Sequence, residues 1–303
     1  MGREQGNQTK AAFHMNFTRF ISCALAGACL LVPNASLGGV AEKSGIGPAT
    51  VAVRTTTAGA WSDFNGDGMN DLVWQGANGF LAFYIMNGPA TRFGLTPYKI
   101  ESGWEIGGTA DFNRDGKADI VLMKTDGSVA FWLMDGTEIT RGIVPYKVPA
   151  GWRIAGTGDF NADGQPDILL THTDSSVAFW LMDETTLRTG VVPFKVPGGW
   201  QIAAIGDFNG DAQSDLVFVS TEGLVAVWLM DGIKFADSVI PFRMPAGWQL
   251  IGAGDFNGDR NTDLVIQTSN QLFAFWLMEK TRFKAAVGPY QLTVDPWRLV
   301  GPR

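Results

Sequence analysis

Five short acidic segments contain the residues of this 303-residue chain that could do chemistry. Each segment, called an acidic loop below, reads Asp-x-Asn-x-Asp-x-x-x-Asp, and its nine residues are numbered as positions 1 to 9. The first aspartates are Asp63, Asp111, Asp159, Asp207 and Asp255, so the loops recur every 48 residues. Oxygen side chains at positions 1, 3, 5 and 9, with the backbone carbonyl of position 7, form a donor set that suits calcium.

We therefore predict calcium as the cofactor of these loops. The predicted ligands, from the first loop to the fifth, are Asp63, Asn65, Asp67, Met69 and Asp71; Asp111, Asn113, Asp115, Lys117 and Asp119; Asp159, Asn161, Asp163, Gln165 and Asp167; Asp207, Asn209, Asp211, Gln213 and Asp215; and Asp255, Asn257, Asp259, Asn261 and Asp263. The alternative is that the loops are only turns, because Asp and Asn side chains bond their own backbone. A turn needs one or two such residues, whereas three neighbouring carboxylates without a cation repel each other.

Position 6 divides the loops into two groups. Gly68, Gly116 and Gly164 occupy it in the first three loops, whereas Ala212 and Arg260 occupy it in the last two. A calcium loop with this spacing turns sharply at position 6, and a Cβ is penalised where φ is positive. The sequence therefore predicts weaker metal sites in the fourth and fifth loops.

The net charge of −7 has a local origin, because three carboxylates in each of five loops supply fifteen of the 30 acidic residues. Five calcium ions would turn this charge into +3. The acidity therefore indicates bound cations, and it argues against nucleic acid as a partner.

The N-terminal 41 residues resemble a secretory signal peptide, with Met15 as an alternative true start. A short basic stretch at 15–19 precedes an apolar run at 20–32, and small residues at 39–41 offer a cleavage point. The run has about 13 residues, whereas a membrane span needs about 20, so we expect no transmembrane helix. Both cysteines, Cys23 and Cys29, lie in this segment. We predict an exported protein, either secreted or at the cell surface or in the periplasm.

The remaining chain reads as a short segment at 42–50 followed by one domain at 51–303. Each 48-residue repeat holds four short β-rich runs separated by turn residues. This length and strand number predict an all-β propeller of five four-stranded blades. Trp104, Trp152, Trp200 and Trp248 open four repeats, while Thr56 stands in the first.

The missing opening strand recurs at the other end of the chain, where Trp297 begins a copy of it. We expect this C-terminal strand to complete the first blade and close the ring, which removes the open sheet edges. An open or paired array is the weaker alternative.

The stretch Gly158-Asp-Phe-Asn-Ala-Asp-Gly-Gln-Pro-Asp-Ile168 resembles the FG-GAP/VCBS repeat family, which includes the calcium-bearing blades of integrin α-subunit propellers. The resemblance covers all five copies. It implies calcium loops between the first two strands of each blade and an extracellular role in binding, adhesion or scaffolding, and some relatives are lectins. This chain departs from the integrin type, which has seven blades, and it lacks the glycine in two loops.

Catalytic machinery is hard to find, and we predict that the protein is not an enzyme. His172 is the one histidine after the signal peptide, and its equivalents in other repeats are Gly76, Lys124, Ser220 and Thr268. A solvent-facing tip explains such a variable position better than a catalytic base. An enzyme or accessory component of an exported polysaccharide-degrading system remains the alternative, with no residue to nominate.

Two further repeated sets are candidates for ligand contacts. Tyr84, Trp132, Trp180, Trp228 and Trp276 share one blade position, either as core aromatics or as sugar-stacking platforms. Lys99, Lys147, Lys195 and Arg243 share another, either as solvated strand ends or as a ring for an anionic ligand. We predict a recognition or adhesion module for an extracellular protein or glycan, with a multivalent lectin as the alternative.

Overall fold

The computed structural model describes residues 61–88, 90–292 and 297–302. The predicted signal peptide at 1–41, the segment at 42–50 and the first ten residues of the predicted domain lie outside the described residues. In the part of the chain that is described, no helix is long and apolar enough to cross a bilayer.

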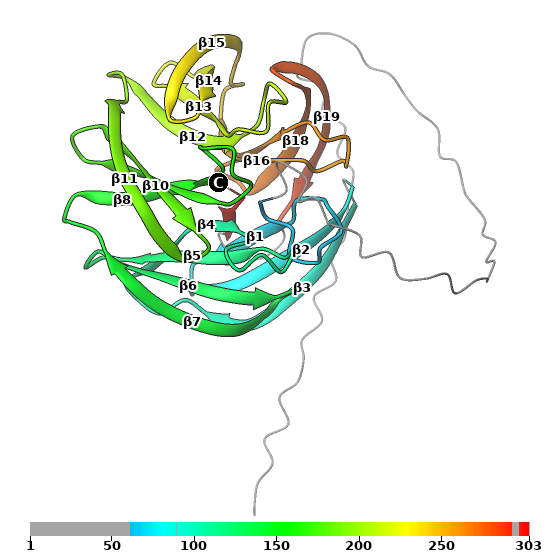
Figure 1. Cartoon of the computed structure of the whole chain (residues 1–303). Coiled ribbons are helices and arrows are strands. Elements are labelled where there is room, and N and C mark those ends of the chain that lie inside the picture. The colour runs from blue at the N-terminus through cyan, green and yellow to red at the C-terminus, as the bar shows by residue number, and fades with distance from the viewer. Residues whose placement is uncertain (1–60, 89, 293–296, 303) are drawn as a thin grey trace, which may run out of the picture.

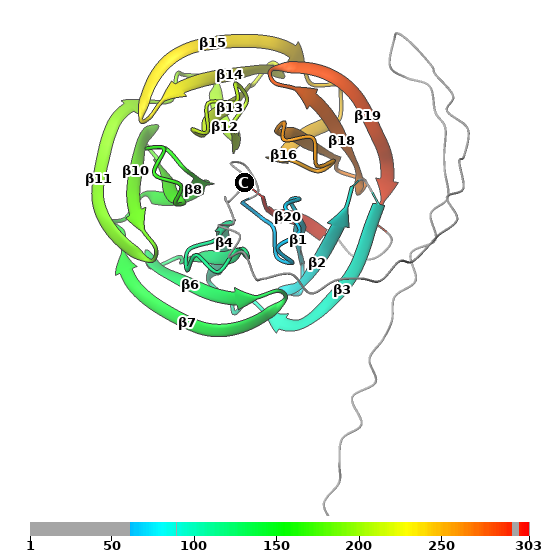
Figure 2. The ribbon, with the colours of Figure 1, turned by 45° about the vertical axis from the view of Figure 1, so that its right-hand side comes forward.

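The described chain forms five four-stranded antiparallel sheets arranged in a ring, which confirms the five-bladed propeller (Figures 1 and 2). Blade 1 has the strand order β20-β1-β2-β3, and blades 2 to 5 are β4–β7, β8–β11, β12–β15 and β16–β19. In each blade the four strands lie side by side in this order, with the first strand at the centre of the ring and the last at its rim (Figure 2).

The four strand positions have nearly constant bounds in every blade. The innermost strands are β20 (Trp297–Gly301), β4 (Trp104–Ala110), β8 (Trp152–Gly158), β12 (Trp200–Gly206) and β16 (Trp248–Gly254). The second strands are β1 (Leu72–Gly76), β5 (Asp119–Lys124), β9 (Asp167–His172), β13 (Asp215–Ser220) and β17 (Asp263–Thr268). The third strands are β2 (Phe80–Asn87), β6 (Ser128–Asp135), β10 (Ser176–Asp183), β14 (Leu224–Asp231) and β18 (Leu272–Glu279). The outermost strands are β3 (Ala90–Lys99), β7 (Glu138–Lys147), β11 (Thr186–Lys195), β15 (Lys234–Arg243) and β19 (Arg282–Gln291).

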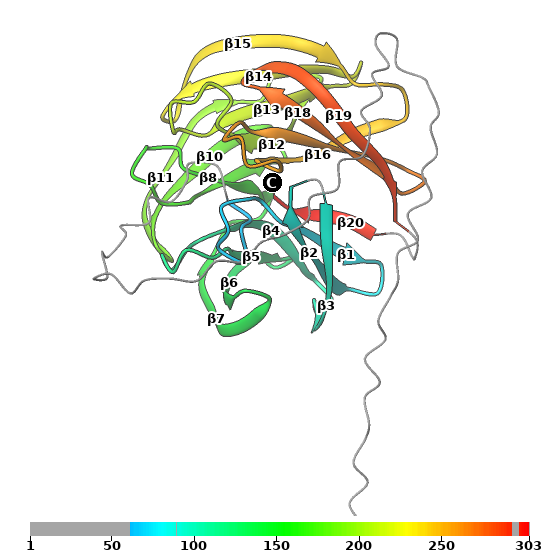
Figure 3. The same cartoon turned by 90° about the vertical axis from the view of Figure 1, so that its right-hand side faces the viewer.

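The C-terminal strand closes the ring as the sequence predicts. Strand β20 pairs with β1 in antiparallel register, from Val73 opposite Gly301 to Gly76 opposite Trp297, and lies near the ring centre (Figure 3). The Arg298 guanidinium also donates to the Gln75 side-chain oxygen at 2.7 Å. The two ends of the described chain therefore share one sheet.

The hydrophobic core lies between neighbouring blades, in clusters shared by the facing sheets. Second strands are buried on both faces, because each is sandwiched in this way, which explains their unbroken apolar runs. The outermost strands have an exposed face and form the rim of the ring. One proline in each outermost strand suits its edge position, because proline cannot donate to a ladder.

Candidate functional site

In blades 2 to 5 the acidic loop connects the innermost and second strands, and in blade 1 it leads into the second strand, β1. The first aspartate of each loop organises the turn. In the first loop, Asp63 Oδ1 accepts the Gly66 N–H at 2.7 Å and its Oδ2 accepts the Gly68 N–H at 2.7 Å. The bond from the N–H of position 6 to this Oδ2 recurs in all five loops, at 2.7 to 2.9 Å. The loop therefore folds inward around the position 1 carboxylate.

Positions 3 and 5 repeat the same local bond two residues along. In the first loop, Asn65 Oδ1 accepts the Asp67 N–H at 2.8 Å, and Asp67 Oδ1 accepts the Met69 N–H at 3.0 Å. Equivalent bonds form in the other four loops. The position 5 aspartates are exposed to solvent in every loop.

A buried phenylalanine at position 2 fixes each loop to its blade. Phe112 is fully buried, and its ring packs edge-on against Phe131 of the third strand with centroids 4.9 Å apart. Blades 1 and 3 use the same edge-on pair and blade 5 a tilted one. Burying a ring of this size anchors the turn on the rigid sheet.

The position 9 aspartate has a different environment from the other acidic residues. In the third loop, Asp167 is fully buried, its Oδ2 accepts the Phe160 N–H at 3.0 Å and its Oδ1 accepts the Met182 N–H at 2.8 Å. All five loops show this pair of bonds. Burial raises the pKa of Asp167 to about 7 and that of Asp119 to about 8. This carboxylate ties the loop to the third strand.

The position 9 aspartate is both an anchor of its loop and one of the predicted ligands. Among the described residues, no three Asp, Glu, His or Cys side chains are gathered closely enough to hold a metal ion as they stand. The carboxylates of positions 1 and 5 and the amide oxygen of position 3 lie in the turn itself, and direct ligation by the position 9 aspartate stays a prediction. This all-oxygen donor set still fits calcium. Burial also raises the pKa of Asp63, Asp111 and Asp159, and a bound cation would offset that penalty.

Side chains at position 7 lie against the turn between the third and outermost strands of their own blade. Gln165 Oε1 accepts the Glu184 N–H at 3.0 Å, Asn261 Oδ1 accepts the Lys280 N–H at 3.2 Å, and the Lys117 ammonium pairs with Asp135. The Met69 sulfur and the Gln213 amide oxygen occupy the same place. Because these side chains are engaged here, a ligand from position 7 would be its backbone carbonyl.

Two positions in each loop have positive φ. Position 6 has a positive φ in every loop, including 69° at Ala212 and 65° at Arg260. This confirms that the backbone at position 6 takes the left-handed conformation that favours glycine. Position 4 is also left-handed, with φ of 60° at both Arg114 and Ala162. A left-handed residue with a side chain costs about 1–2 kcal/mol. The second and third loops therefore carry at position 4 the penalty that the fourth and fifth carry at position 6.

The fifth loop has a competing cation. Lys284 Nζ lies 3.3 Å from Asp259 Oδ2, at position 5 of this loop. By contrast, Arg114 of the second loop pairs with Asp183 of the neighbouring blade at 2.8 Å and leaves its own loop carboxylates free of that charge. The weaker sites predicted for the fourth and fifth loops stay a prediction, and Lys284 supplies a reason specific to the fifth.

The loops also bond to one another around the ring. The Ala118 N–H, at position 8, donates to the Asp63 carbonyl of the preceding loop at 2.7 Å. The Ser214 and Asn70 N–H groups make the equivalent bonds to Asp159 and Asp255. A cation that orders one loop would thus brace its neighbour.

The repeated aromatic set divides by burial. Tyr84 and Trp276 are only 4% and 6% exposed, which supports their role as core aromatics. Trp132, Trp180 and Trp228 are half-buried. Trp132 and Trp180 each line a cavity, whereas Trp228 packs on Phe218 with ring centroids 4.5 Å apart.

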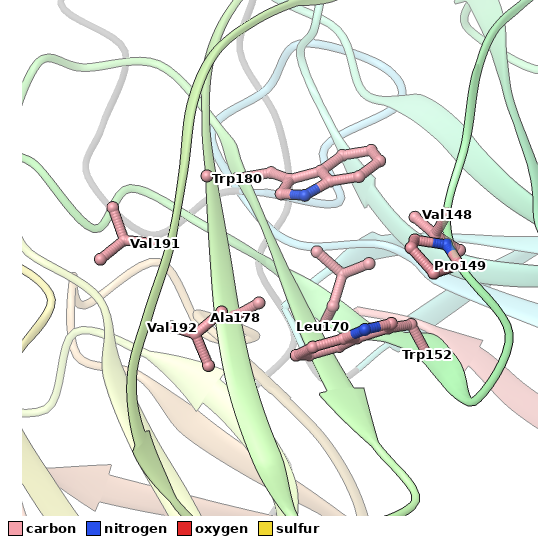
Figure 4. A pocket seen from close by; sticks show the side chains of 9 residues that line it. Val148, Pro149, Trp152, Leu170, Ala178, Trp180, Val191 and Val192 are labelled. Atoms are coloured by element: carbon pink, nitrogen blue, oxygen red, sulfur yellow. The ribbon is translucent and has the colours of Figure 1, made fainter.

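The two cavities are the same pocket in two blades. The pocket of blade 3 has a volume of about 220 Å³, with Trp152 and Trp180 on opposite sides and Leu170 between them (Figure 4). The pocket of blade 2 has a volume of about 260 Å³. Its lining includes Trp104, Leu122, Ala130, Trp132, Gly142, Ile143 and Val144, each 48 residues before its counterpart in blade 3.

Blades 1 and 4 place larger residues at the leucine position of this pocket, whereas blade 5 has Ile266. Trp74 stands there in blade 1 and Phe218 in blade 4, both almost fully buried. The glycine opposite the tryptophan also changes, since Trp180 pairs with Gly190 whereas Trp228 pairs with Ser238. A Cβ at residue 190 would lie 3.3 Å from Trp180. Compared with blade 4, smaller residues at these two positions therefore leave the space.

The contacts between adjacent outermost strands also differ between blades 2 and 3 and blades 4 and 5. Tyr146 packs on Trp180 of the next blade, and its hydroxyl accepts the Leu187 N–H at 2.6 Å. Tyr98 accepts the Ile139 N–H at 3.1 Å in the same manner. The residues equivalent to Tyr146 in the next two blades are Phe194 and Phe242, and those equivalent to Leu187 are Phe235 and Phe283. Phe194 and Phe235 pack on Trp228, and Phe242 and Phe283 pack on Trp276. Hydroxyl bonds in one half of the ring are replaced by phenylalanine rings in the other.

The other repeated candidates lie at strand ends. Lys99, Lys147, Lys195 and Arg243 are all exposed, as solvated strand ends would be. Lys195 Nζ lies 2.8 Å from Asp174 Oδ2, and Asp174 Oδ1 lies 2.8 Å from His172 Nδ1. His172 also packs against Trp152, with ring centroids 5.0 Å apart. This histidine is therefore part of a surface contact around Trp152.

Sequence reasoning named Trp132 and Trp180 but missed the pockets that they line. The overlooked signal is a departure from the repeat, because the pocket leucine occurs only at Leu122 and Leu170 among five equivalent residues. The innermost tryptophans, Trp104 and Trp152, were assigned only to strand openings. Their contribution to the pockets becomes visible only when the second strand of the same blade, with Leu122 or Leu170, lies beside them.

Comparison with known proteins places the chain by its repeats. The model of the FG-GAP-like repeat matches residues 63–122, 111–170, 159–218 and 207–266. No protein of curated function matches the chain.

Solved structures with a similar chain course include Raptor from Chaetomium thermophilum (11% identity, TM-score 0.38, 78% of this chain and 22% of that one). AofleA from Arthrobotrys oligospora is similar over 75% of this chain and 69% of its own, at 9% identity and a TM-score of 0.44. The C-terminal WD40 domain of Sif2 is similar over 76% and 60%, at 14% identity and a TM-score of 0.34. This chain thus spans about a fifth of Raptor. Because the repeat model covers more than half of its length, the chain belongs to the FG-GAP-like repeat family.

Proposed function

We propose that this protein is an exported recognition module whose acidic loops bind calcium. The propeller of FG-GAP-like repeats is typically a non-catalytic interaction module, and the export follows from the signal-peptide pattern at residues 1–41. Calcium serves structure in this account, and the ligand binds elsewhere on the propeller.

The fivefold donor set carries the proposal. Each loop offers the position 1 carboxylate, held inward by its bond to the N–H of position 6, and an exposed position 5 carboxylate two residues beyond an amide. These oxygens suit a hard cation. In a chain whose cysteines lie in the signal segment, bound metal would supply stability that disulfides supply elsewhere.

The test is calorimetric titration of calcium into the chelator-treated chain, with thermal melting recorded in parallel. We expect three or more ions per chain and a rise in Tm. Ligand binding to the folded state adds about 2.7 kcal/mol per site at a hundredfold excess over Kd. If calcium produces no heat of binding and no shift in Tm, the loops are only turns and the calcium proposal is wrong.

A matched pair of variants assigns the heat to the loops. Asp115→Asn and Asp163→Asn alter exposed position 5 carboxylates, so both should fold normally without calcium and each should lose about one ion. Asp126→Asn, on a turn outside the loops, is the control and should bind as the unaltered chain does. Equal binding by all three variants would place the calcium elsewhere.

A further inference from the structure

We propose that the pockets of blades 2 and 3 are two equivalent binding sites for the ring of a neutral saccharide. This inference rests on the proposed recognition function and names its ligand class. It assigns two sites to the molecule, although the aromatic position recurs in all five blades.

The size and walls of the pocket suit a single ring. Volumes of about 220 and 260 Å³ fall below the roughly 300–1,000 Å³ of pockets for drug-sized ligands. Two indoles on opposite sides, with a leucine between them, offer flat apolar surfaces (Figure 4). The face of an indole is electron-rich, and the polarised C–H groups of a pyranose pack well against such a face.

The polar groups of the pocket favour a ligand with hydroxyl groups. The indole N–H groups of Trp132 and Trp180, which line the two pockets, donate to no acceptor among the described residues. A sugar hydroxyl is both donor and acceptor, so it would accept such a bond, which a hydrocarbon ligand cannot do.

The charge of the lining indicates a neutral ligand. The pocket of blade 3 is lined by no charged side chain, whereas the lining of the blade 2 pocket includes Lys99 and Glu101. The features that both pockets share are therefore uncharged. In the pocket of blade 3, an anionic or cationic ligand would have to give up its hydration without an ionic partner, which is costly.

The entrance is open to solvent. Val144 and Val192 line the two pockets and are 61% and 56% exposed. Because both sites belong to adjacent blades of one rigid ring, a branched or repeating glycan could engage them together and gain avidity.

The test uses a panel of neutral methyl glycosides, namely the α- and β-glucopyranosides and galactopyranosides, with methyl glucuronide as the charged comparison. Binding is followed by tryptophan fluorescence and saturation-transfer NMR. We expect at least one neutral glycoside to bind at two sites per chain, with a Kd of about 1 mM, and the glucuronide to bind at least tenfold more weakly.

Variants that copy blade 4 provide the decisive comparison. Leu122→Phe and Leu170→Phe introduce the ring that Phe218 provides in blade 4, so each should remove one site and the double variant both. Calcium titration and thermal melting are used to check that the variants remain folded. Leu250→Phe, outside the pockets, is a control for the added ring and should leave both sites intact.

Several outcomes would overturn the assignment. They are the failure of all neutral glycosides to bind, binding unchanged in the double variant, and binding of N-acetyltryptophanamide in preference to every glycoside. The last outcome would identify an aromatic peptide side chain as the occupant. If calcium binds while the pockets fail these tests, the calcium-binding module stands and only the saccharide assignment falls.

Discussion

Blades 2 and 3 differ from blades 4 and 5 in how they pack around the same tryptophan. In blades 2 and 3, the hydroxyl of a tyrosine from the preceding blade accepts a backbone N–H of the outermost strand, and Leu122 or Leu170 leaves a cavity beside the indole. In blade 4, Phe218 packs on the indole, and Trp276 of blade 5 is buried between Phe242 and Phe283. One half of the ring therefore keeps space that the other half fills.

The acidic loops show the opposite behaviour, because they keep the same hydrogen bonds in both halves. Every loop retains the position 1 turn and the position 9 anchor. The difference indicates that the loop structure is needed in every blade, whereas the pockets are a property of blades 2 and 3. The following variants test this contrast, from the largest expected effect to the smallest.

Loss of the position 9 anchor should be the most damaging change, and equally so in both halves. In the unaltered chain, a backbone N–H of the third strand donates to the carboxylate of Asp167 or Asp263. Asp167→Asn and Asp263→Asn each put an amide N–H₂ group in the place of one carboxylate oxygen, so that one backbone N–H loses its acceptor. A buried donor left without its acceptor costs about 1–3 kcal/mol, so each variant should lose about that much free energy of unfolding. Urea denaturation of chelator-treated protein measures it. A much smaller loss in blade 5 would show that the loops of the two halves are not equivalent.

Emptying the filled site of blade 4 should come next. Phe218→Leu removes a fully packed ring and should lower the free energy of unfolding by about 2 kcal/mol, since truncating a buried phenylalanine to alanine costs about 3–5 kcal/mol. Leu170→Phe should cost less than 1 kcal/mol, below the usual 1–3 kcal/mol for overpacking, because its cavity exists. Denaturation curves compare the two directly. Equal losses would mean that blade 3 has no usable space.

Glycine exchanges at position 6 should have opposite signs in the two halves. Gly164→Ala adds a side chain at a φ of 79° and should lower the free energy of unfolding by about 1 kcal/mol. Ala212→Gly relieves the same strain at a φ of 69° and should raise it by about 0.5 kcal/mol, since the added chain entropy of glycine offsets part of the gain. Thermal melting in chelator resolves both signs. Stabilisation by Gly164→Ala would contradict the account of the turn.

Removal of the lysine beside the fifth loop should have the smallest effect. Lys284→Ala takes away an ammonium group 3.3 Å from Asp259, and exposed pairs of this kind are worth about 0.2–1 kcal/mol. Calcium affinity at this loop should therefore rise up to about fivefold. Arg188→Ala, at the equivalent position of the outermost strand two blades earlier, leaves the fifth loop untouched and is the control. A fall in affinity at that loop would show that Lys284 assists the cation.

The repeat period fixed much of the fold in advance, because the 48-residue spacing, the four runs per repeat and the displaced Trp297 strand all follow from the order of residues. The left-handed backbone at Ala212 and Arg260 was also predictable, since the loop geometry is local. The environment of Asp167 was not, because its second partner, the Met182 N–H, comes from a strand 15 residues away. Sequence spacing alone does not distinguish such an anchor from a metal ligand.

The pockets were beyond prediction for a related reason. Whether Trp180 is core or surface depends on Leu170, Gly190 and Trp152, which reach it from three other strands. The sequence offered both interpretations for all five aromatic residues. Packing assigns them differently, with Tyr84 and Trp276 in the core and Trp132 and Trp180 beside open space.

A crystal structure of the chain grown with calcium, with an anomalous difference map, tests the central claim most directly. The account predicts a peak in each of the first three loops, bounded by the oxygens of positions 1, 3 and 5, with Asp71, Asp119 and Asp167 still bonded to the third strand. Loops that stay free of anomalous density at saturating calcium, with their carboxylates on backbone N–H groups alone, would contradict it.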